Sequence, residues 1–329
     1  MRKFGLVVLV LALVVMTASA NGTAEEGQRI VLEAGTFHPP GTGDVESLQY
    51  FKEFVEKQSN GEITVNVSFG ETLGTELDTV EQTRLGTLQV VIDGLGTMGL
   101  YGKQFASWTV PYAYPDVSSL VASAKGPIGK AMSKRMEADG VLFGGLIPMG
   151  FRHMTANVPA VEPSDLKGIK LRLPNNRSWI TVWEKFGVIP TPIPAPEMYL
   201  ALQTGLVDAQ ENPYTTIHVR KLWEVQKYVI ETSHLADFRI LVINKAFVDG
   251  LSEKHRKIVM EGVDAAIAWQ TEFVEDLQEK YKKEAMDNGM QIIQPNTQAY
   301  RQMAMSAWSA LAKDWEPWVY DQMIKETTR

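Results

Sequence analysis

Segments of β-strand type alternate with helical segments over the first third of this chain, and this order restricts the fold more than any other feature. The segments 30–35, 63–69 and 88–92 have the apolar or alternating patterns expected of strands. Between them, apolar side chains recur at helical spacing over 44–60 and 75–85. A strand–helix–strand–helix–strand order predicts βα units and a largely parallel sheet. The expected fold class is therefore α/β.

A single long helix is predicted in the last third of the chain. Ser252 is a suitable N-cap, apolar residues follow it on one stripe, and Asn288 and Gly289 end the pattern. A helix of more than 30 residues extends roughly 50 Å at about 1.5 Å per residue. Because this length exceeds one small domain, we expect the helix to connect two domains. The other predicted elements are strands at 141–147, 169–173 and 240–243 and helices near 177–186, 195–204, 214–225 and 297–325.

The first twenty residues have the features of an export signal. Arg2 and Lys3 precede the uncharged run Phe4–Met16, and Ala18 and Ala20 form an Ala-x-Ala cleavage motif. A membrane anchor is the alternative, but spanning a bilayer needs about 20 apolar residues. The chain has no Cys that could carry a lipid anchor. We therefore expect cleavage after about Ala20 and a freely diffusing periplasmic protein.

The charge and the missing cysteines exclude several classes of partner and site. The chain has 32 Lys+Arg and 39 Asp+Glu, a net charge of −7, and loss of Arg2 and Lys3 would change this to −9. Such a chain is poorly suited to bind nucleic acid or an anionic membrane. Without Cys it has no thiolate metal site and no cysteine nucleophile. The five His show no metal-binding spacing, so we expect neither a metal nor a cofactor.

The segment Gly94–Gly99 (GLGTMG) matches the dinucleotide motif G-x-G-x-x-G, which makes an NAD-dependent oxidoreductase the rival hypothesis. It follows the predicted strand 88–92, and Asp116 lies about 20 residues downstream, where an acid can hold a ribose hydroxyl. Three observations oppose this reading. The residues that follow show no helical stripe, an earlier βα unit precedes the motif, and the chain is predicted to be exported. No G-x-S-x-G nucleophile motif occurs either, so we expect no enzyme.

A series of motifs in the second half of the chain carries the most specific signal. These are GFRHMT at 150–155, PSDLKG at 163–168, IKLRLP at 169–174, EMYLALQTG at 197–205, VDAQENP at 207–213 and WEVQKY at 223–228. In this order the sequence resembles the solute-binding receptors of TRAP (tripartite ATP-independent periplasmic) transporters, a group that includes dicarboxylate and sialic acid receptors. The LGTE segment around Gly74 and the Pro111-Tyr112 segment also match, so the resemblance covers nearly the whole mature chain.

The resemblance implies a two-lobed α/β periplasmic solute-binding fold with a ligand cleft between discontinuous lobes and the long helix spanning both. One lobe would comprise about 26–149 plus 238–277, and the other about 150–237 plus 278–329. Such a receptor closes on an organic acid and delivers it to a TRAP permease in the membrane. We expect a monomer without a cofactor. An exported scaffold or adhesion protein with no small ligand is a further alternative.

The resemblance also implies the residues of the ligand site. Arg172 would bind the substrate carboxylate, and Arg152 and Asn212 would also contact it. A guanidinium suits this role because its fork of donors holds a carboxylate at two points and stays charged at any working pH. For Arg152 a structural salt bridge is an equal alternative, and Asn212 before Pro213 is also compatible with an ordinary turn. The other candidates are the apolar walls Phe37, Trp179 and Trp183, the polar His38 and Asn176, and Glu76 and Asp93 as acceptors from substrate hydroxyls.

The segment before Glu197 bears on the choice of ligand. Members of the group often carry an aromatic residue there, whereas this chain has Pro194-Ala195-Pro196. Asn176 and its neighbours add polar capacity after the strand that carries Arg172. We therefore favour a sugar acid, a uronate or aldonate, over a plain C4-dicarboxylate, which is the alternative.

Overall fold

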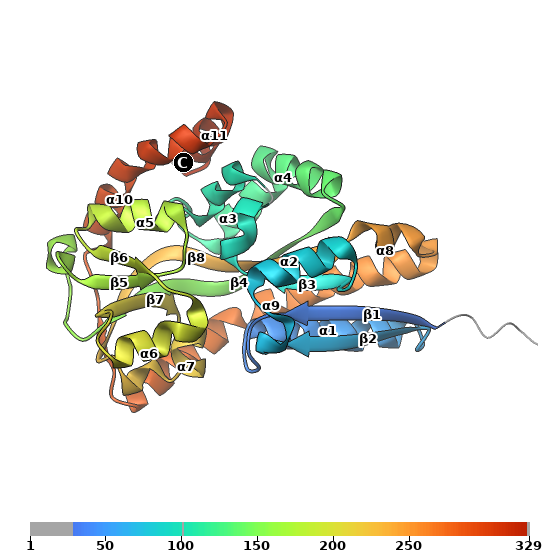
Figure 1. Ribbon diagram of the computed structural model, residues 1–329, viewed down its shortest axis with the longest axis horizontal. Helices are drawn as coiled ribbons and strands as arrows, with labels where there is room; N and C mark the ends of the chain where they lie inside the picture. The colour runs from blue at the N-terminus through green and yellow to red at the C-terminus, as the bar shows by residue number, and fades with distance from the viewer. Residues whose placement is uncertain (1–28, 101, 328–329) are drawn as a thin grey trace, which may run out of the picture.

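The computed structural model describes residues 29–100 and 102–327, so the predicted export signal lies outside the described residues. In these residues one mixed sheet forms the centre of the molecule, with helices on both faces (Figure 1). Its strands are β1 (Ile30–Thr36), β2 (Ile63–Phe69), β3 (Val90–Asp93), β4 (Val141–Ala156), β5 (Lys170–Leu173), β6 (Ile189–Pro192), β7 (Ala209–Pro213), β8 (Tyr228–Asn244) and β9 (Gln291–Ile293). None of the helices in 29–100 and 102–327 has the length and apolar character needed to span a bilayer.

The sheet is parallel at both ends and antiparallel in its centre. The strand order is β2-β1-β3-β8-β4-β7-β5-β6, with β9 added beside β8. β1 runs parallel to β2 and β3, and β5 runs parallel to β6 and β7, as the βα order predicts. The long strands β4 and β8 instead pair antiparallel with each other and with their neighbours β7 and β3. The predicted α/β class is confirmed, but the centre differs from a largely parallel sheet.

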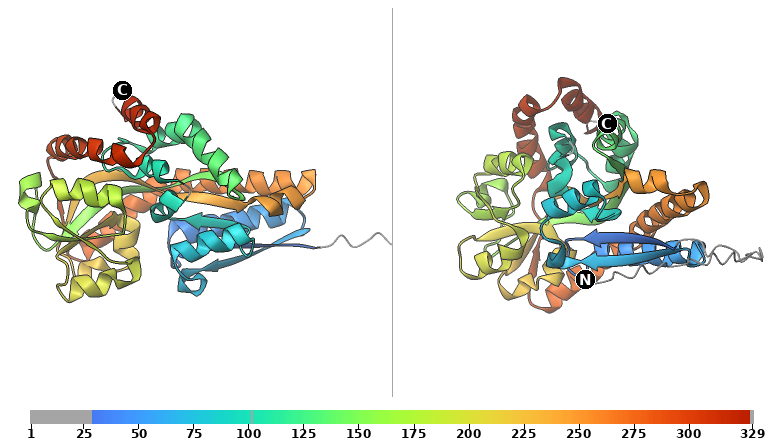
Figure 2. Two further views of the ribbon diagram at one scale, coloured as in Figure 1. Left: turned by 45° about the horizontal axis from the view of Figure 1, so that its top comes forward. Right: turned by 45° about the vertical axis from the view of Figure 1, so that its right-hand side comes forward.

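Helices cover both faces of the sheet, as the two views in Figure 2 show. The α-helices are α1 (Gly43–Gln58), α2 (Glu76–Leu85), α3 (Val117–Lys125), α4 (Pro127–Ala138), α5 (Arg177–Lys185), α6 (Met198–Gln203), α7 (Tyr214–Val219), α8 (Lys245–Gly250), α9 (Glu253–Asp287), α10 (Thr297–Leu311) and α11 (Pro317–Thr327). Short 3₁₀ segments are η1 (Gly70–Leu73), η2 (Leu95–Leu100), η3 (Lys103–Thr109), η4 (Pro163–Leu166), η5 (Ala195–Glu197), η6 (Leu222–Glu224) and η7 (Ala312–Asp314).

Alternating side chains of β8 supply the apolar cores on the two faces. Ile240 and Val242 pack into the core formed with α3, α4, α5, α10 and α11. Leu241 and Ile243 point the opposite way, into the core formed with α1 and the first part of α9. Successive side chains of a strand point to opposite faces, so a strand that is apolar throughout must be covered on both. A third core lies between α6, α7 and the end of α9.

Three elements, β4, β8 and α9, run through both ends of the molecule. The predicted long helix is confirmed as α9, whose N-cap Ser252 accepts a hydrogen bond from the backbone N–H of His255 at 3.2 Å. Its first part packs closely on α1, because a Cβ atom on Gly262 would lie only 2.7 Å from Val55. Its last part contacts α7, where Tyr281 stacks on His218 with 4.1 Å between the ring centroids. The sheet and α9 thus hold two halves together.

The GLGTMG segment does not open an α-helix. After β3 the chain forms the 3₁₀ turns η2 and η3, and the next α-helix is α3, which begins at Val117. A dinucleotide site needs the N-terminus of a helix at the glycine motif to receive the pyrophosphate. The geometry expected of the rival oxidoreductase is therefore absent from this part of the described chain.

Candidate functional site

Arg152, in the middle of β4, is enclosed by acceptors from neighbouring strands. Its Nε and Nη2 atoms lie 2.6 and 3.0 Å from the two carboxylate oxygens of Glu211. Nη1 donates to Asp237 at 3.1 Å, and Nη2 also donates to the side-chain oxygen of Asn212 at 2.9 Å. Arg152 is 5% exposed and both carboxylates are fully buried. The structure therefore has the salt bridge that was one of the two sequence interpretations, and contact of Arg152 with a ligand stays a prediction.

The charged groups around Arg152 extend into a chain of alternating sign. Nη1 of Arg239 donates to both oxygens of Asp237 at 3.1 Å, and its Nε lies 3.2 Å from Asp44 on α1. The charged members in order are Asp44, Arg239, Asp237, Arg152 and Glu211. His234 contacts Glu211 at the end of this chain, and burial lowers the pKa of its ring below the ordinary value. Burial alone would raise the pKa of Glu211, but Arg152 and His234 hold that pKa below its ordinary value. Because each guanidinium contacts two carboxylates, neither Arg152 nor Arg239 is an unpaired cation.

Arg172 differs from these two arginines in having no counter-ion. It lies on β5, is 3% exposed, and its Nε donates to the backbone carbonyl of Ile193 at 2.8 Å. Arg172 forms no ion pair with any residue that the structure describes. Burial lowers its pKa to about 10, and the attraction of the nearby Glu211 does not fully offset that effect. At neutral pH Arg172 is therefore a buried, charged donor that forms no ion pair with any described residue.

Glu76 is the first residue of α2, in the first half of the molecule. Its carboxylate lies against the backbone of Gly94: a Cβ atom there would overlap Oε1 and lie 3.1 Å from the carboxyl carbon. The same position is 3.6 Å from the ring of His38, which in turn contacts Phe37 with 4.0 Å between centroids. Burial raises the pKa of Glu76 to about 7. The charge of Glu76 also acts on Arg172, raising its pKa, so the two groups share one electrostatic environment.

Two buried acids, Asp93 and Asp44, accompany the half-buried Glu76. Asp93, at the end of β3, accepts a hydrogen bond from the hydroxyl of Thr79 at 2.8 Å, and its second oxygen has no partner among the described residues. Burial raises its pKa well above the ordinary value. Asp44 is fully buried as well, and burial raises its pKa despite the attraction of Arg239. The first half of the molecule thus contributes three acidic side chains with raised pKa values, Asp44, Glu76 and Asp93.

The aromatic candidate Trp179 supports Arg152. The guanidinium carbon of Arg152 lies 4.7 Å from the centre of the Trp179 ring, a cation–π geometry. The indole N–H donates to the backbone carbonyl of Thr109 at 2.5 Å. Asn176 caps α5 by accepting from the backbone N–H of Trp179 at 3.2 Å. Trp183 is fully buried beside His234.

The structure arranges the predicted residues in two groups. One charged member of each group, Arg152 and Glu76, acts on the pKa of Arg172. One group, from β4, β7 and α5, contains Arg152, Asn212, Trp179 and Asn176, and the other, from the first half of the molecule, contains Phe37, His38, Glu76 and Asp93. Sequence reasoning missed Asp44, Glu211, His234, Asp237 and Arg239. The available signal was the spacing of Asp237 and Arg239, since two opposite charges two residues apart in an apolar strand lie on one face.

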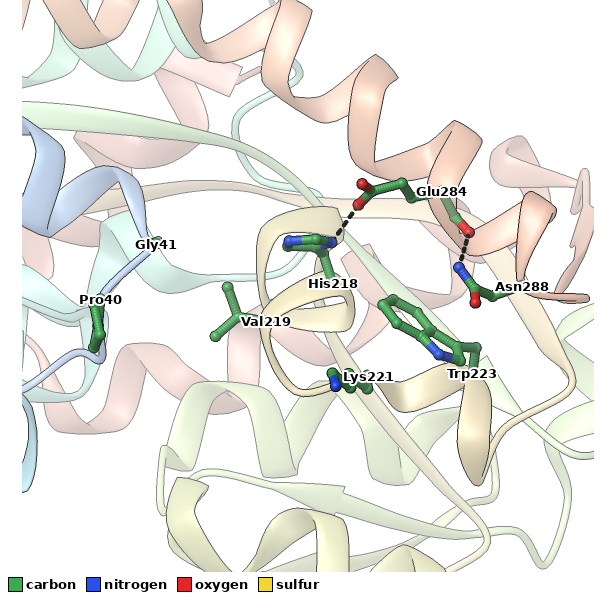
Figure 3. A pocket seen from close by; sticks show the side chains of 8 residues that line it. All are labelled: Pro40, Gly41, His218, Val219, Lys221, Trp223, Glu284 and Asn288. Carbon is green, nitrogen blue, oxygen red and sulfur yellow. Dashed lines mark hydrogen bonds and ion pairs between the residues drawn. The ribbon is translucent and has the colours of Figure 1, made fainter.

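A pocket of about 380 Å³ lies apart from both groups of predicted residues (Figure 3). It is lined by Pro40, Gly41, His218, Val219, Lys221, Trp223, Glu284 and Asn288. Its walls come from the loop after β1 on one side and from α7, η6 and the end of α9 on the other. Nδ1 of His218 contacts the carboxylate of Glu284, and none of the predicted ligand-binding residues lines this pocket.

Comparisons with known proteins give a consistent result. Residues 34–314 match the family described as bacterial extracellular solute-binding protein, family 7. The C4-dicarboxylate-binding periplasmic protein DctP of Rhodobacter capsulatus is 29% identical over 258 residues, which are 78% of this chain and 76% of that protein. A TRAP periplasmic solute-binding protein from a Polaromonas species, solved with D-erythronate, superimposes with a TM-score of 0.82 at 27% identity, covering 89% of this chain and 98% of that one. One from Roseobacter denitrificans, solved with L-galactonate, gives 0.81 at 26% identity, covering 91% and 99%.

Proposed function

The chain belongs to family 7 of the bacterial extracellular solute-binding proteins, and from that premise we propose that it binds a sugar acid in the periplasm and delivers it to a TRAP permease. The observation that carries this proposal is Arg172, a buried guanidinium with no counter-ion among the residues that the structure describes. A buried charge is costly unless it is paired, and a carboxylate can accept two parallel hydrogen bonds from a guanidinium. The ligand carboxylate would therefore supply the partner that the protein does not.

We propose that the ligand lies between two lobes that close on it. The lobes are assigned to 26–149 plus 238–277 and to 150–237 plus 278–329. Two features support these limits. Gly150 and Asp237 pair with each other where β4 has a register irregularity, and Gly150 has a φ of 88° that favours glycine. Local irregularities in strands that connect two halves are suitable places for a hinge, and closure around a ligand is a common switching motion.

The preference for a sugar acid rests on the relatives and on the polar side chains. The Polaromonas and Roseobacter proteins were solved with D-erythronate and L-galactonate, both of which have one carboxylate and several hydroxyl groups. The half-buried Glu76 and the buried Asp93 suit such hydroxyls. A C4-dicarboxylate is the second candidate, because the Rhodobacter relative is named for that ligand class. We also propose that the protein is exported, is cleaved after about Ala20, and acts as a monomer.

A ligand screen tests the proposal directly. The mature chain is heated in the presence of D-erythronate, L-galactonate, D-galacturonate, succinate or NAD, and binding to the folded state raises the Tm by mass action. We expect at least one of the sugar acids to raise the Tm and to bind with one site in calorimetry. A response to NAD alone would favour the oxidoreductase, and no response to any organic acid would favour a scaffold protein. Either result contradicts the receptor.

A further inference from the structure

We propose that a buried row of polar side chains positions the amide of Asn212, so that one of its N–H groups is available to the carboxylate of the ligand. The polar row consists of Gln210, Thr155 and Gln226, each at most 3% exposed. None of the three is among the predicted site residues. This inference rests on the proposed function and deepens it, because it adds positioning residues that act through Asn212 and do not touch the ligand themselves.

The polar row extends from β7 to the segment just before β8. Nδ2 of Asn212 donates to Oε1 of Gln210 at 2.6 Å, and Nε2 of Gln210 donates to the hydroxyl of Thr155 at 2.9 Å. That hydroxyl donates in turn to Oε1 of Gln226 at 3.0 Å. Asn212 and Gln210 share one face of β7 because they are two residues apart, and Thr155 lies opposite Gln210 on the antiparallel strand β4. Paired strands therefore hold most of the row in place.

The far end of the polar row fixes the direction of every hydrogen bond in it. Nε2 of Gln226 donates to two backbone carbonyls at 3.1 and 3.3 Å, and a carbonyl can only accept. This turns the amide oxygen of Gln226 toward Thr155, whose hydroxyl must then donate to it and accept from Gln210. The oxygen of Gln210 is thereby left to accept from Asn212. An isolated amide or hydroxyl could point either way, so the direction depends on the whole network.

Arg152 alone does not fix the amide of Asn212. Its Nη2 atom carries two hydrogens but lies near three acceptors: the backbone oxygen and one carboxylate oxygen of Glu211, both at 3.0 Å, and Oδ1 of Asn212 at 2.9 Å. The hydrogen bond to Asn212 is therefore shared, whereas the contact of Asn212 with Gln210 is shorter. Without the polar row the amide could rotate and turn its oxygen toward the ligand. An amide oxygen cannot bind a carboxylate, because both groups only accept.

Asn212 keeps one N–H group that a ligand can use. One hydrogen of Nδ2 is directed at Gln210, and the only other contact of Nδ2 among the described residues is the sulfur of Met198 at 3.6 Å. A thioether is a weak acceptor, whereas an ionised carboxylate is a strong one. Arg172 is the register partner of Gln210 in the pairing of β5 with β7, so its side chain lies on the same face of the sheet as Asn212. The carboxylate proposed to bind Arg172 is therefore the expected acceptor.

Isosteric substitutions of Thr155 test this inference. Thr155→Val replaces the hydroxyl with a methyl group, and Thr155→Ser keeps the hydroxyl as the matched control. Each is made in the wild type and in Asn212→Ala. The Kd is measured by calorimetry well below the Tm, with whichever of D-erythronate, L-galactonate and D-galacturonate raises the Tm of the wild type most. Thr155→Val should weaken binding at least tenfold in the wild type but less than threefold in Asn212→Ala, since it acts through that amide. Thr155→Ser should bind within threefold of the wild type.

A second measurement does not depend on the folding of Thr155→Val. The two side-chain amide protons of Asn212 are identified in ¹⁵N-labelled wild type by their absence from Asn212→Ala. Saturation with the same sugar acid should shift one resonance more than the other, because Gln210 already holds the second proton. Unchanged affinity of Thr155→Val, an equal loss in both backgrounds, or two unshifted resonances would overturn the inference while the receptor function stands. Failure of the wild type to bind any organic acid would instead reject the function itself.

Discussion

Arg152 and Glu211 form a bidentate ion pair between the neighbouring strands β4 and β7: Nε and Nη2 of Arg152 lie 2.6 and 3.0 Å from the two carboxylate oxygens of Glu211. Asp237 and the ring of Trp179 occupy two further sides of the same guanidinium. Arg172, by contrast, is equally buried and has only a carbonyl partner. Among the described residues, Arg152 is therefore paired with protein carboxylates and Arg172 has no counter-ion, which is consistent with the ligand-binding role proposed for Arg172.

Replacing Arg172 should abolish acid binding without loss of the fold. We expect Arg172→Ala to weaken binding of the best sugar acid at least 100-fold, since removing one partner of a buried charged pair typically costs about 2–5 kcal/mol. Arg172→Lys should also bind poorly, because an ammonium cannot reproduce the planar fork. Calorimetry measures both, with Arg135→Ala on the exposed face of α4 as the control. Unchanged affinity in Arg172→Ala contradicts the assignment.

Replacing Arg152 should instead destabilise the protein before any ligand is added. Arg152→Ala leaves Glu211 and Asp237 as buried carboxylates with fewer partners, and breaking a buried pair in this way typically costs about 3–5 kcal/mol. Arg172→Ala removes an unpaired buried cation, so the free energy of unfolding should not fall by a comparable amount. Urea denaturation of the ligand-free variants compares the two. An equal decrease in the free energy of unfolding in both variants would show that Arg172 also has a charged partner within the protein.

Local sequence patterns predicted most of the fold but not the centre of the sheet. The parallel pairing of β1 with β2 and β3 and the bounds of α9 follow from hydrophobic periodicity and from the cap Ser252. The strand predicted at 240–243 is only the last part of β8, which begins at Tyr228. Charged and polar residues interrupt the apolar run there, and β4 has three register irregularities that break strict alternation. Antiparallel pairing of such long strands depends on contacts that no local window contains.

The same limit applies to the site. Arg172 lies between Leu171 and Leu173, and Arg152 follows the apolar strand predicted at 141–147, so hydrophobic periodicity does not distinguish their roles. What separates them is the presence of counter-ions, and those of Arg152 are 59 and 85 residues away along the chain. The family resemblance could identify Arg172 as the residue expected to bind the carboxylate of the ligand. Only the three-dimensional structure distinguishes the paired arginine from the unpaired one.

Glu76 should make stability depend on pH near neutrality. Burial raises the pKa of its carboxyl from 4.5 to about 7. Between these values the folded state binds the proton more tightly than the unfolded state, so stability falls as pH rises from about 4.5 to about 7. Glu76→Gln removes this titration, and the Tm of the variant relative to the wild type should therefore increase over the same interval. A Tm difference that stays constant from pH 4.5 to 8 would contradict the raised pKa.

Two glycines of the GLGTMG segment should respond differently to the same substitution. A methyl group on Gly94 would overlap the carboxylate of Glu76, whereas one on Gly99 would meet no atom within 4 Å. We expect Gly94→Ala to displace Glu76 and to weaken sugar-acid binding at least tenfold. Gly99→Ala should bind like the wild type. Calorimetry with L-galactonate makes the comparison. Equal effects of the two substitutions would contradict a role for the contact between Gly94 and Glu76.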